Sequence, residues 1–342
     1  MKIKRLSLTM LGLTTLGMSA APAVMAGNLT VANSDMTLAG GVAAAGIYSD
    51  GAGIGQGSDT TPTDFLLELS ASAKAGGAGF VAGYGSLLEP TVFGGSLNNT
   101  AFDNTMKLQY ASLTVKPTEA VSIEAGTLAT KIGYEVANTY ANPNILLGAL
   151  WNSQPIYYPG VRASYSGDGI SGFVETNEDH AMGGANGGIP NYGYVVGASG
   201  VAGSVSYAVT YYNADAGRDC FDVIVSGELA GIKVAANIDY HMINKPTTGL
   251  DDSALGIALY AMPAVAGISV PVRLEYLDSG TSGVYATADG AGYTLTVTPT
   301  YGLGDNTFVR GELAYAMADT KVFDGSTSDT MTSYGVQVGY KF

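Results

Sequence analysis

Apolar and polar residues alternate in short segments along most of the chain, and this period of two limits the fold more than any other feature. In residues 232–242, IKVAANIDYHM, the apolar Ile238 and Tyr240 alternate with the polar Asp239 and His241. Side chains two positions apart share one face of a β-strand, so each such segment has an apolar face and a polar face. The same pattern recurs in FLLELSASAK, YTLTVTPTY and TFVRGELAYAM. The alternation predicts an all-β protein.

The connections between these segments also alternate, between tight turns and longer polar loops. About sixteen candidate strands can be counted from the pattern. Every second connection is short, as at Gly167-Asp168-Gly169 and Ala230-Gly231, whereas the others resemble NEDHAMGGANGGIPN. An even number of strands with short turns at one end and long loops at the other is typical of an outer-membrane barrel. We therefore expect a transmembrane antiparallel β-barrel of about sixteen strands, with short periplasmic turns and longer extracellular loops.

A water-soluble β-sandwich would show the same alternation, but it would place the apolar faces inside. Tyrosines argue for the membrane alternative, because they gather near the ends of the predicted strands, as the aromatic girdles of a membrane barrel do. A closed barrel is also the one β structure that pairs every backbone group within lipid. These tyrosines are Tyr48, Tyr84, Tyr192, Tyr240, Tyr276, Tyr293, Tyr301 and Tyr340.

The first 26 residues are predicted to be a secretory signal peptide. A basic head, MKIKR, precedes an apolar stretch and small residues, with cleavage expected after Ala26, so that residues 27–342 form the barrel. A retained membrane helix is the alternative, but Ser, Thr, Gly and Pro interrupt the apolar run. Loss of Lys2, Lys4 and Arg5 would take the formal net charge from −14 to −17, which argues against a nucleic-acid partner.

Residues that could support catalysis or a cofactor are few. The chain has one cysteine, Cys220, and two histidines, His180 and His241, with no CxxC motif and no spacing typical of a zinc site. GDGISG at residues 167–172 links two strands and opens no helix that could bind a phosphate. We expect no enzyme activity, no cofactor and no metal site. Loose binding of a divalent ion by the acidic loop around His180, bridging to lipopolysaccharide, is a secondary hypothesis.

Charged residues lie on the polar faces of many strands. If the apolar faces contact lipid, these charges point into the barrel, where they are tolerated only if the interior is wet. A barrel of this strand number is too wide for side chains to fill and typically encloses an aqueous channel. Wall salt bridges between residues two apart, such as Arg273 and Glu275, are the alternative role for these charges. The wall residues predicted to line the pore are Arg162, Arg273, Arg310, Glu312, Lys233 and Asp239.

One long connection, within residues 127–161, differs from the others because it is apolar. It contains the only tryptophan, Trp151, together with Tyr134, Leu150 and an Asn-Pro pair that predicts a short helix through residues 144–151. Loops of this length in compact proteins are usually functional or disordered, and this loop is too apolar for disorder. Its side chains need cover from lipid, a neighbouring subunit or the barrel interior.

This segment resembles a known family. AGTLATKIGYEVANTYANPNILLGALWNSQPIYYPGVRASY is similar to the segment of the OmpL-like β-barrel porins that combines IGYE, an Asn-Pro pair, an aromatic-rich stretch and PGVR, although TK stands here before IGYE where TP is commoner. The resemblance implies a porin of a Gram-negative outer membrane that passes small hydrophilic solutes. The final strand, ending in Tyr340 and Phe342, likewise resembles the carboxy-terminal signal that the barrel-assembly machinery recognises.

The sequence thus predicts a passive, mildly cation-preferring pore. We expect residues 129–159 to fold into the lumen as a constriction, with Lys131 and Glu135 adding to the field of the wall charges and Trp151, Tyr134 and Leu150 packing the loop. The expected partners are outer-membrane lipids, lipopolysaccharide, the assembly machinery and small solutes. A homotrimer and a monomer both fit the sequence. The alternatives are a solute-specific channel and a surface or adhesion protein that the barrel anchors.

Overall fold

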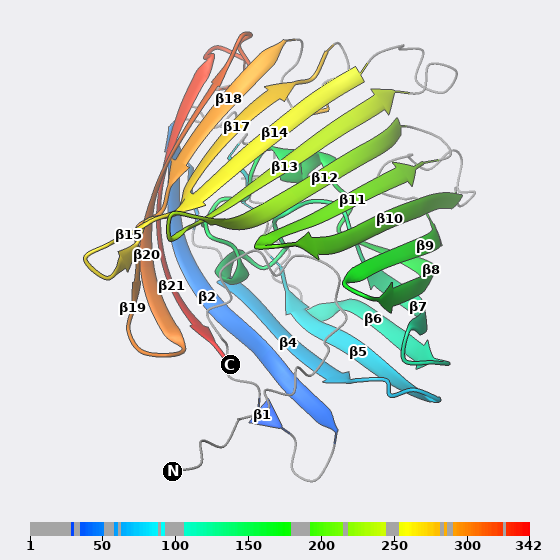
Figure 1. The fold of residues 1–342 in the computed structure, drawn as a ribbon. Helices are drawn as coiled ribbons and strands as arrows, with labels where there is room; N and C mark the ends of the chain where they lie inside the picture. Colours follow the sequence, from blue (N-terminus) through cyan, green and yellow to red (C-terminus); the bar gives the residue numbers. More distant parts are fainter. Residues whose placement is uncertain are drawn as a thin grey trace.

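The protein is a closed antiparallel β-barrel (Figure 1). The computed structural model describes residues 29–30, 35–50, 58–60, 63–87, 90–92, 106–178, 192–214, 218–243, 253–280, 284–285, 290–323 and 326–342. The proposed signal peptide and His180 lie outside the described residues. Among the described residues, no helix has the length and hydropathy needed to cross a bilayer.

Sixteen long strands form the wall, which confirms the strand number that the sequence predicts. Each strand pairs with the next along the chain, and β21 pairs with β2 from Gly41↔Lys341 to Asp50↔Thr332, which closes the ring. The strands are β2 (Met36–Asp50), β4 (Thr63–Ala71), β5 (Gly77–Ser86), β6 (Lys107–Lys116), β7 (Val121–Ala129), β8 (Tyr157–Gly167), β9 (Ile170–Glu178), β10 (Tyr192–Ala202), β11 (Val205–Asn213), β12 (Arg218–Leu229), β13 (Ile232–Ile243), β14 (Ser253–Met262), β17 (Val272–Asp278), β18 (Ala291–Val297), β20 (Thr307–Ala318) and β21 (Thr330–Lys341).

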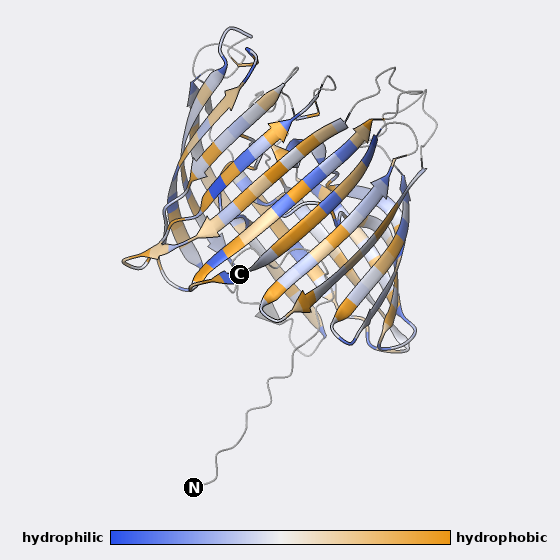
Figure 2. Cartoon of the chain, turned by 45° about the horizontal axis from the view of Figure 1, so that its top comes forward, coloured by the Kyte–Doolittle hydropathy of each residue, from blue (hydrophilic) through white to orange (hydrophobic). Residues whose placement is uncertain are grey.

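The alternation along each strand separates an outer apolar face from an inner polar face. Ile238 and Tyr240 of β13 are exposed on the outside, whereas Asn237, Asp239 and His241 are buried inside. Figure 2 shows the resulting alternation of hydrophobic and hydrophilic bands along the strands. An outer face of this kind matches lipid, because a protein in water would gain free energy by burying it.

The connections differ at the two ends of the barrel, as the sequence predicts. Two-residue turns join β8 to β9 and β12 to β13, and Asp168 and Ala230 adopt positive φ values of 53° and 51° there. Two other connections at this end extend as small hairpins that contain β15 (Ala264–Val265), β16 (Ile268–Ser269) and β19 (Thr300–Gly302). Two further short strands, β1 (Leu29–Thr30) and β3 (Ser58–Thr60), pair with β2.

The last strand lies beside the first, with its end fixed to the wall. The backbone N–H groups of Gly40 and Phe342 each donate to the carbonyl of the other at 3.0 Å. Tyr340 is exposed on the outer face, and its ring centroid lies 6.4 Å from that of Phe342. The residues of the expected assembly signal, Tyr340 and Phe342, thus lie where the closing strand ends beside β2.

Candidate functional site in the barrel lumen

The connection between β7 and β8, residues 130–156, folds into the barrel interior, and we call it the inner loop. It contains two short 3₁₀ turns, η1 (Thr139–Ala141) and η2 (Leu150–Ser153). The prediction of a helix through residues 144–151 is therefore wrong, because η2 begins only at Leu150. Asn142 ends η1 instead of beginning a helix, and its side chain binds both the N–H and the carbonyl of Val136, at 2.9 and 2.6 Å.

The η1 turn is held by the wall around β4, β20 and β21. Asp64 of β4 accepts hydrogen bonds from the N–H and the hydroxyl of Thr139, at 2.6 and 2.9 Å. The guanidinium of Arg310 donates to the carbonyls of Thr139 and Asn142, both at 2.7 Å. Gln337 of β21 donates to the Thr139 hydroxyl at 2.9 Å. Arg310 is thus buried beneath the loop and bonded to its backbone.

A second anchor lies at the centre of the loop, around Arg273 of β17. Its guanidinium donates to the carboxylate of Glu135 at 2.5 Å and to the carbonyl of Leu146 at 2.8 Å, and it lies 3.4 Å from Glu275. The other oxygen of Glu135 accepts the N–H of Gly148 at 2.5 Å. Arg273 has no solvent exposure, so its charge is neutralised within the protein.

Glu312 of β20 binds the backbone of the loop directly. Its two carboxylate oxygens accept the N–H groups of Ile145 and Leu146, at 2.5 and 2.8 Å, and one of them also accepts the hydroxyl of Thr298 at 2.7 Å. Hydrogen bonds to an ionised acceptor are stronger than neutral ones. The carboxylate therefore satisfies two backbone donors of a loop segment that has no secondary structure of its own.

The opposite side of the loop contacts β12 and β13. Asn237 accepts the N–H of Tyr134 at 3.0 Å, and Asp239 accepts the side-chain amide of Gln154 at 2.7 Å. Arg218 donates to the carbonyl of Ser153 at 2.9 Å. Together with the anchors on β4, β17, β20 and β21, these bonds show that the inner loop spans the lumen from wall to wall.

The apolar residues of the inner loop pack against small and aromatic wall residues. Tyr134 and Leu150 are buried in one cluster with Ala258 and Tyr260 of β14, and the rings of Tyr134 and Tyr260 lie 4.4 Å apart. Trp151 packs in a separate cluster with Leu147, and a backbone bridge joins Leu147 to Thr91 of the β5–β6 connection. The barrel interior, rather than lipid, provides the cover that these side chains require.

Arg162 and Lys131 lie with two carboxylates, those of Glu124 and Glu175, where the loop leaves the wall. Arg162 lies 2.6 Å from Glu175 and 3.2 Å from Glu124, and it donates to the carbonyl of Ala129 at 2.8 Å. Lys131 is partly buried, and the Thr210 hydroxyl donates to its carbonyl at 3.4 Å. Burial, followed by repulsion from Arg162, lowers the pKa of Lys131 to about 8.

The inner wall between the loop and the short turns is lined by small polar residues. Lys233 of β13 is exposed near this end, opposite Glu228 of β12. Of the eight charged residues predicted to line the pore, six on the wall and two in the inner loop, Glu135, Arg162, Arg273, Arg310, Glu312 and Asp239 are buried, whereas Lys131 and Lys233 keep solvent exposure. The exposed or half-buried hydroxyl residues of this wall include Ser70, Thr114, Ser122, Ser164, Ser166, Ser199, Ser206 and Ser226.

Sequence reasoning missed several residues that hold the loop, notably Asp64, Asn237, Gln154 and Gln337. All except Gln154 occupy inward positions in the strand alternation, so the period of two places them inside the barrel. Their loop partners are 75 to 198 residues away in sequence. No short motif signals contacts at that separation.

Solved structures with a similar fold are outer-membrane proteins. DcaP, an outer-membrane channel of Acinetobacter baumannii, matches with a TM-score of 0.61 and 12% identity over 90% of this chain and 97% of the other. A loop-deletion mutant of OmpT from Vibrio cholerae matches with a TM-score of 0.59 and 11% identity, over 90% and 99% of the two chains. A mutant of the Rh. blastica porin gives 0.55 and 13%, over 90% and 100%. At these identities the matches show the shared fold.

A family model gives the sequence-level assignment. No curated protein sequence matches the chain. The model described as "Putative beta-barrel porin-2, OmpL-like" matches residues 64–342, which include all the wall strands from β5 to β21, most of β4 and the whole inner loop. The resemblance seen in the IGYE segment thus extends over most of the chain. The protein belongs to the OmpL-like beta-barrel porin-2 family of porin-like outer-membrane channels.

Proposed function

We propose that this protein is a passive diffusion pore for small hydrophilic solutes and ions. One observation carries the proposal: an internal loop is bonded to the lumen wall on several sides, while a hydroxyl-lined wall remains accessible toward the short turns. Burying charged side chains inside a barrel costs free energy. A barrel that served only as an anchor would gain nothing in return for that cost.

The inner loop acts as the constriction in this proposal. Arg273, Arg310 and Glu312 bond to the loop backbone, and Glu135 of the loop also pairs with Arg273, so these side chains mainly fix the position of the loop. Solutes pass beside the loop, where Lys131 and Lys233 are the predicted pore-lining cations that keep solvent exposure. Small polar solutes fit such a path better than large apolar ones, because its exposed wall offers hydroxyl groups.

A mild cation preference follows from the charge balance. The whole chain has a formal net charge of −14, and two of the wall cations, Arg162 and Arg273, are paired with carboxylates. An acidic mouth concentrates counter-ions and raises their rate of entry. Residual basic charge at Lys131 and Lys233 opposes this effect, which keeps the preference small.

Export and assembly complete the proposal. Residues 1–26 direct the chain out of the cytoplasm of a Gram-negative bacterium and are removed after Ala26. The barrel-assembly machinery recognises the strand that ends at Phe342, and the outer face then contacts outer-membrane lipids and lipopolysaccharide. A homotrimer would pack through part of this apolar outer face.

Planar-bilayer recording of the purified, folded protein tests the proposed function. We expect stepwise conductance increases in KCl and, in a salt gradient, a small reversal potential of the sign that indicates cation preference. Folded protein that gives no steps would favour the adhesion alternative and would overturn the pore. A reversal potential on the anion side would overturn the cation preference alone. Block of the current by one solute at low concentration would favour a solute-specific channel.

A further inference from the structure

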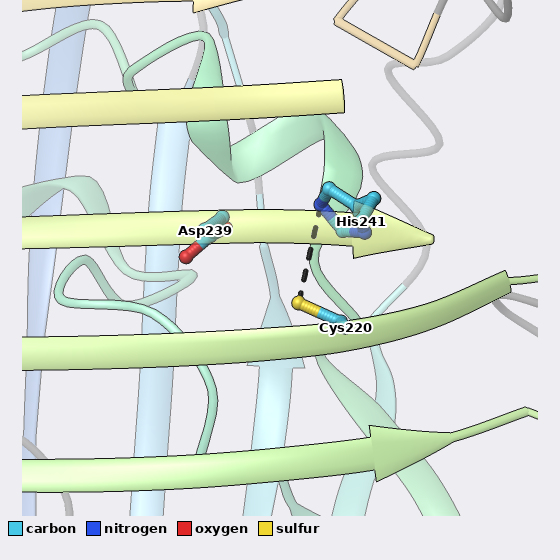
Figure 3. Close-up of side chains that lie close together, drawn as sticks. All are labelled: Cys220, Asp239 and His241. Atoms are coloured by element: carbon cyan, nitrogen blue, oxygen red, sulfur yellow. Dashed lines mark hydrogen bonds between the residues drawn. The ribbon is translucent and has the colours of Figure 1, made fainter. Parts of the chain in front are cut away.

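Cys220, Asp239 and His241 form a cluster of potential metal ligands on the inner wall, beside the inner loop. Cys220 of β12 lies directly opposite His241 of β13, and Sγ is 3.9 Å from Nε2 of the imidazole (Figure 3). One ligand atom from each of the three residues lies within 4.8 Å of the other two. All three side chains are buried, each with 0% exposure.

The cluster has unused capacity to bind a ligand. Within the described part of the chain, Nδ1 of His241 has no hydrogen-bond partner, and neither does Oδ1 of the buried neighbour Asp222. A buried polar atom without a partner costs free energy, so each such atom calls for an explanation. Asp222 pairs with Asp239 across the two strands, and the amide of Asn237 donates to both carboxylates, at 2.6 and 3.0 Å.

We propose that Cys220, His241 and Asp239 bind one divalent transition-metal ion of the zinc class. Thiolate sulfur, imidazole nitrogen and carboxylate oxygen together are the ligand set that zinc prefers, whereas calcium and magnesium prefer oxygen alone. The thiol loses its proton to solvent as the sulfur–metal bond forms. Three protein ligands leave a fourth position for water or another small ligand.

Charge at the site is compatible with a dication. The thiolate and the Asp239 carboxylate supply two negative charges, and Asp222 lies beside them. The one nearby cation on these strands, Arg218, donates to the carbonyl of Ser153 in the inner loop at 2.9 Å. The three ligands lie on two hydrogen-bonded neighbouring strands, and rotation of their side chains would bring the ligand atoms closer to a shared ion.

The site also touches the constriction. Asp239 accepts the side-chain amide of Gln154, which follows the η2 turn of the inner loop. The aromatic ring of Tyr285 covers His241 edge-on, with ring centroids 5.7 Å apart. An ion bound here would therefore lie at the junction between the wall and the inner loop. Binding itself does not depend on conduction, so it can be tested separately from the pore.

Metal binding to the purified, folded protein tests the proposal with Zn²⁺ and Co²⁺ as probes. We expect one Zn²⁺ per chain by equilibrium dialysis and, with Co²⁺, a near-ultraviolet sulfur-to-metal absorption band. Because the chain has a single cysteine, that band can arise only from Cys220. C220S should abolish the band, and C220S, H241N and D239N should each weaken Zn²⁺ binding at least about tenfold. E228Q, which changes an exposed carboxylate at the opposite end of β12 from Cys220, is the matched control and should bind Zn²⁺ as the wild type does.

The proposal is overturned if the wild type binds no stoichiometric Zn²⁺, or if C220S and H241N bind it as well as the wild type. Each variant is first checked for folding by its heat-dependent mobility in an unboiled SDS gel. A second measurement uses only the wild-type chain, in case a variant fails to fold. Zn²⁺ should slow the reaction of Cys220 with a small thiol reagent at least about tenfold, because the thiolate becomes a ligand. An unchanged reaction rate would also overturn the site.

Discussion

Arg273→Ala is expected to release the inner loop from the lumen wall. Arg273 is fully buried and binds Glu135 at 2.5 Å and the carbonyl of Leu146 at 2.8 Å, with Glu275 at 3.4 Å. Its removal would leave two buried carboxylates without their cation, and breaking a buried ion pair in this way costs about 3–5 kcal/mol. The strand ladders do not depend on this contact, so displacement of the loop is the least costly way to hydrate the carboxylates.

That free energy corresponds to about two to four orders of magnitude in the ratio of displaced to bound loop. Two assays follow the displacement. Lys131 is the only Lys or Arg within residues 130–156, so trypsin cleavage of the loop after this residue should become much faster. Single-channel conductance should increase as the loop leaves the lumen.

K233A is the matched control, because it removes one positive charge from an exposed position of the inner wall. It should change ion selectivity with little effect on cleavage at Lys131. If R273A shows the cleavage rate and the conductance of the wild type, while both variants are folded, then the buried ion pair does not hold the loop.

Three further substitutions and conditions test other parts of the structure. Gly133 has a φ of 89°, a conformation that costs alanine about 1–2 kcal/mol, and a Cβ at this position would meet the side chain of Gln154. G133A should therefore loosen the loop and raise the rate of cleavage at Lys131 about tenfold. An unchanged rate would contradict this local geometry. The pKa of Lys131 is about 8, below its usual 10.5, so the cost of burying its charge is present below pH 8 and disappears as pH rises toward 10.5. Reversal potentials should accordingly shift toward cations between pH 7 and 9, and K131Q should remove the shift. Val336 is 62% exposed on the outer face of β21. V336R should therefore lower the free energy of unfolding in lipid by about 2–4 kcal/mol, as measured by urea titration. S206R, on the inner wall, should change that free energy little.

The wall of the barrel could be predicted from the sequence because its signal is local. Alternation such as Ile238, Asp239, Tyr240 assigns inner and outer faces one residue at a time, and turn residues such as Ala230 and Gly231 mark the strand ends. The turn also fixes the register: Leu229 pairs with Ile232, and continuing that register places Cys220 opposite His241. The proximity of thiol and imidazole was thus implicit in a predicted turn, although no spacing motif reveals it.

The arrangement of the inner loop could not be predicted in the same way. Its bonds join residues such as Ile145 and Glu312, which are 167 positions apart, and they depend on the loop reaching the far wall. Composition shows that Leu150 and Trp151 need cover, but lipid, a subunit and the lumen all provide it. The loop lies in the lumen because buried wall residues such as Arg273 and Glu312 bind its backbone. The strand alternation predicts that these two side chains point inward, but it does not predict which loop residues they bind.

Single-channel recording of a variant that lacks residues 142–153 shows whether the inner loop narrows a water-filled lumen. The segment carries the backbone groups that Arg310, Glu312 and Glu275 bind, and it includes Leu150 and Trp151. If the inner loop constricts a water-filled lumen, the folded deletion variant will conduct more current per channel than the wild type at the same voltage and salt concentration. Equal conductance in a folded barrel would contradict the constriction and the path beside it.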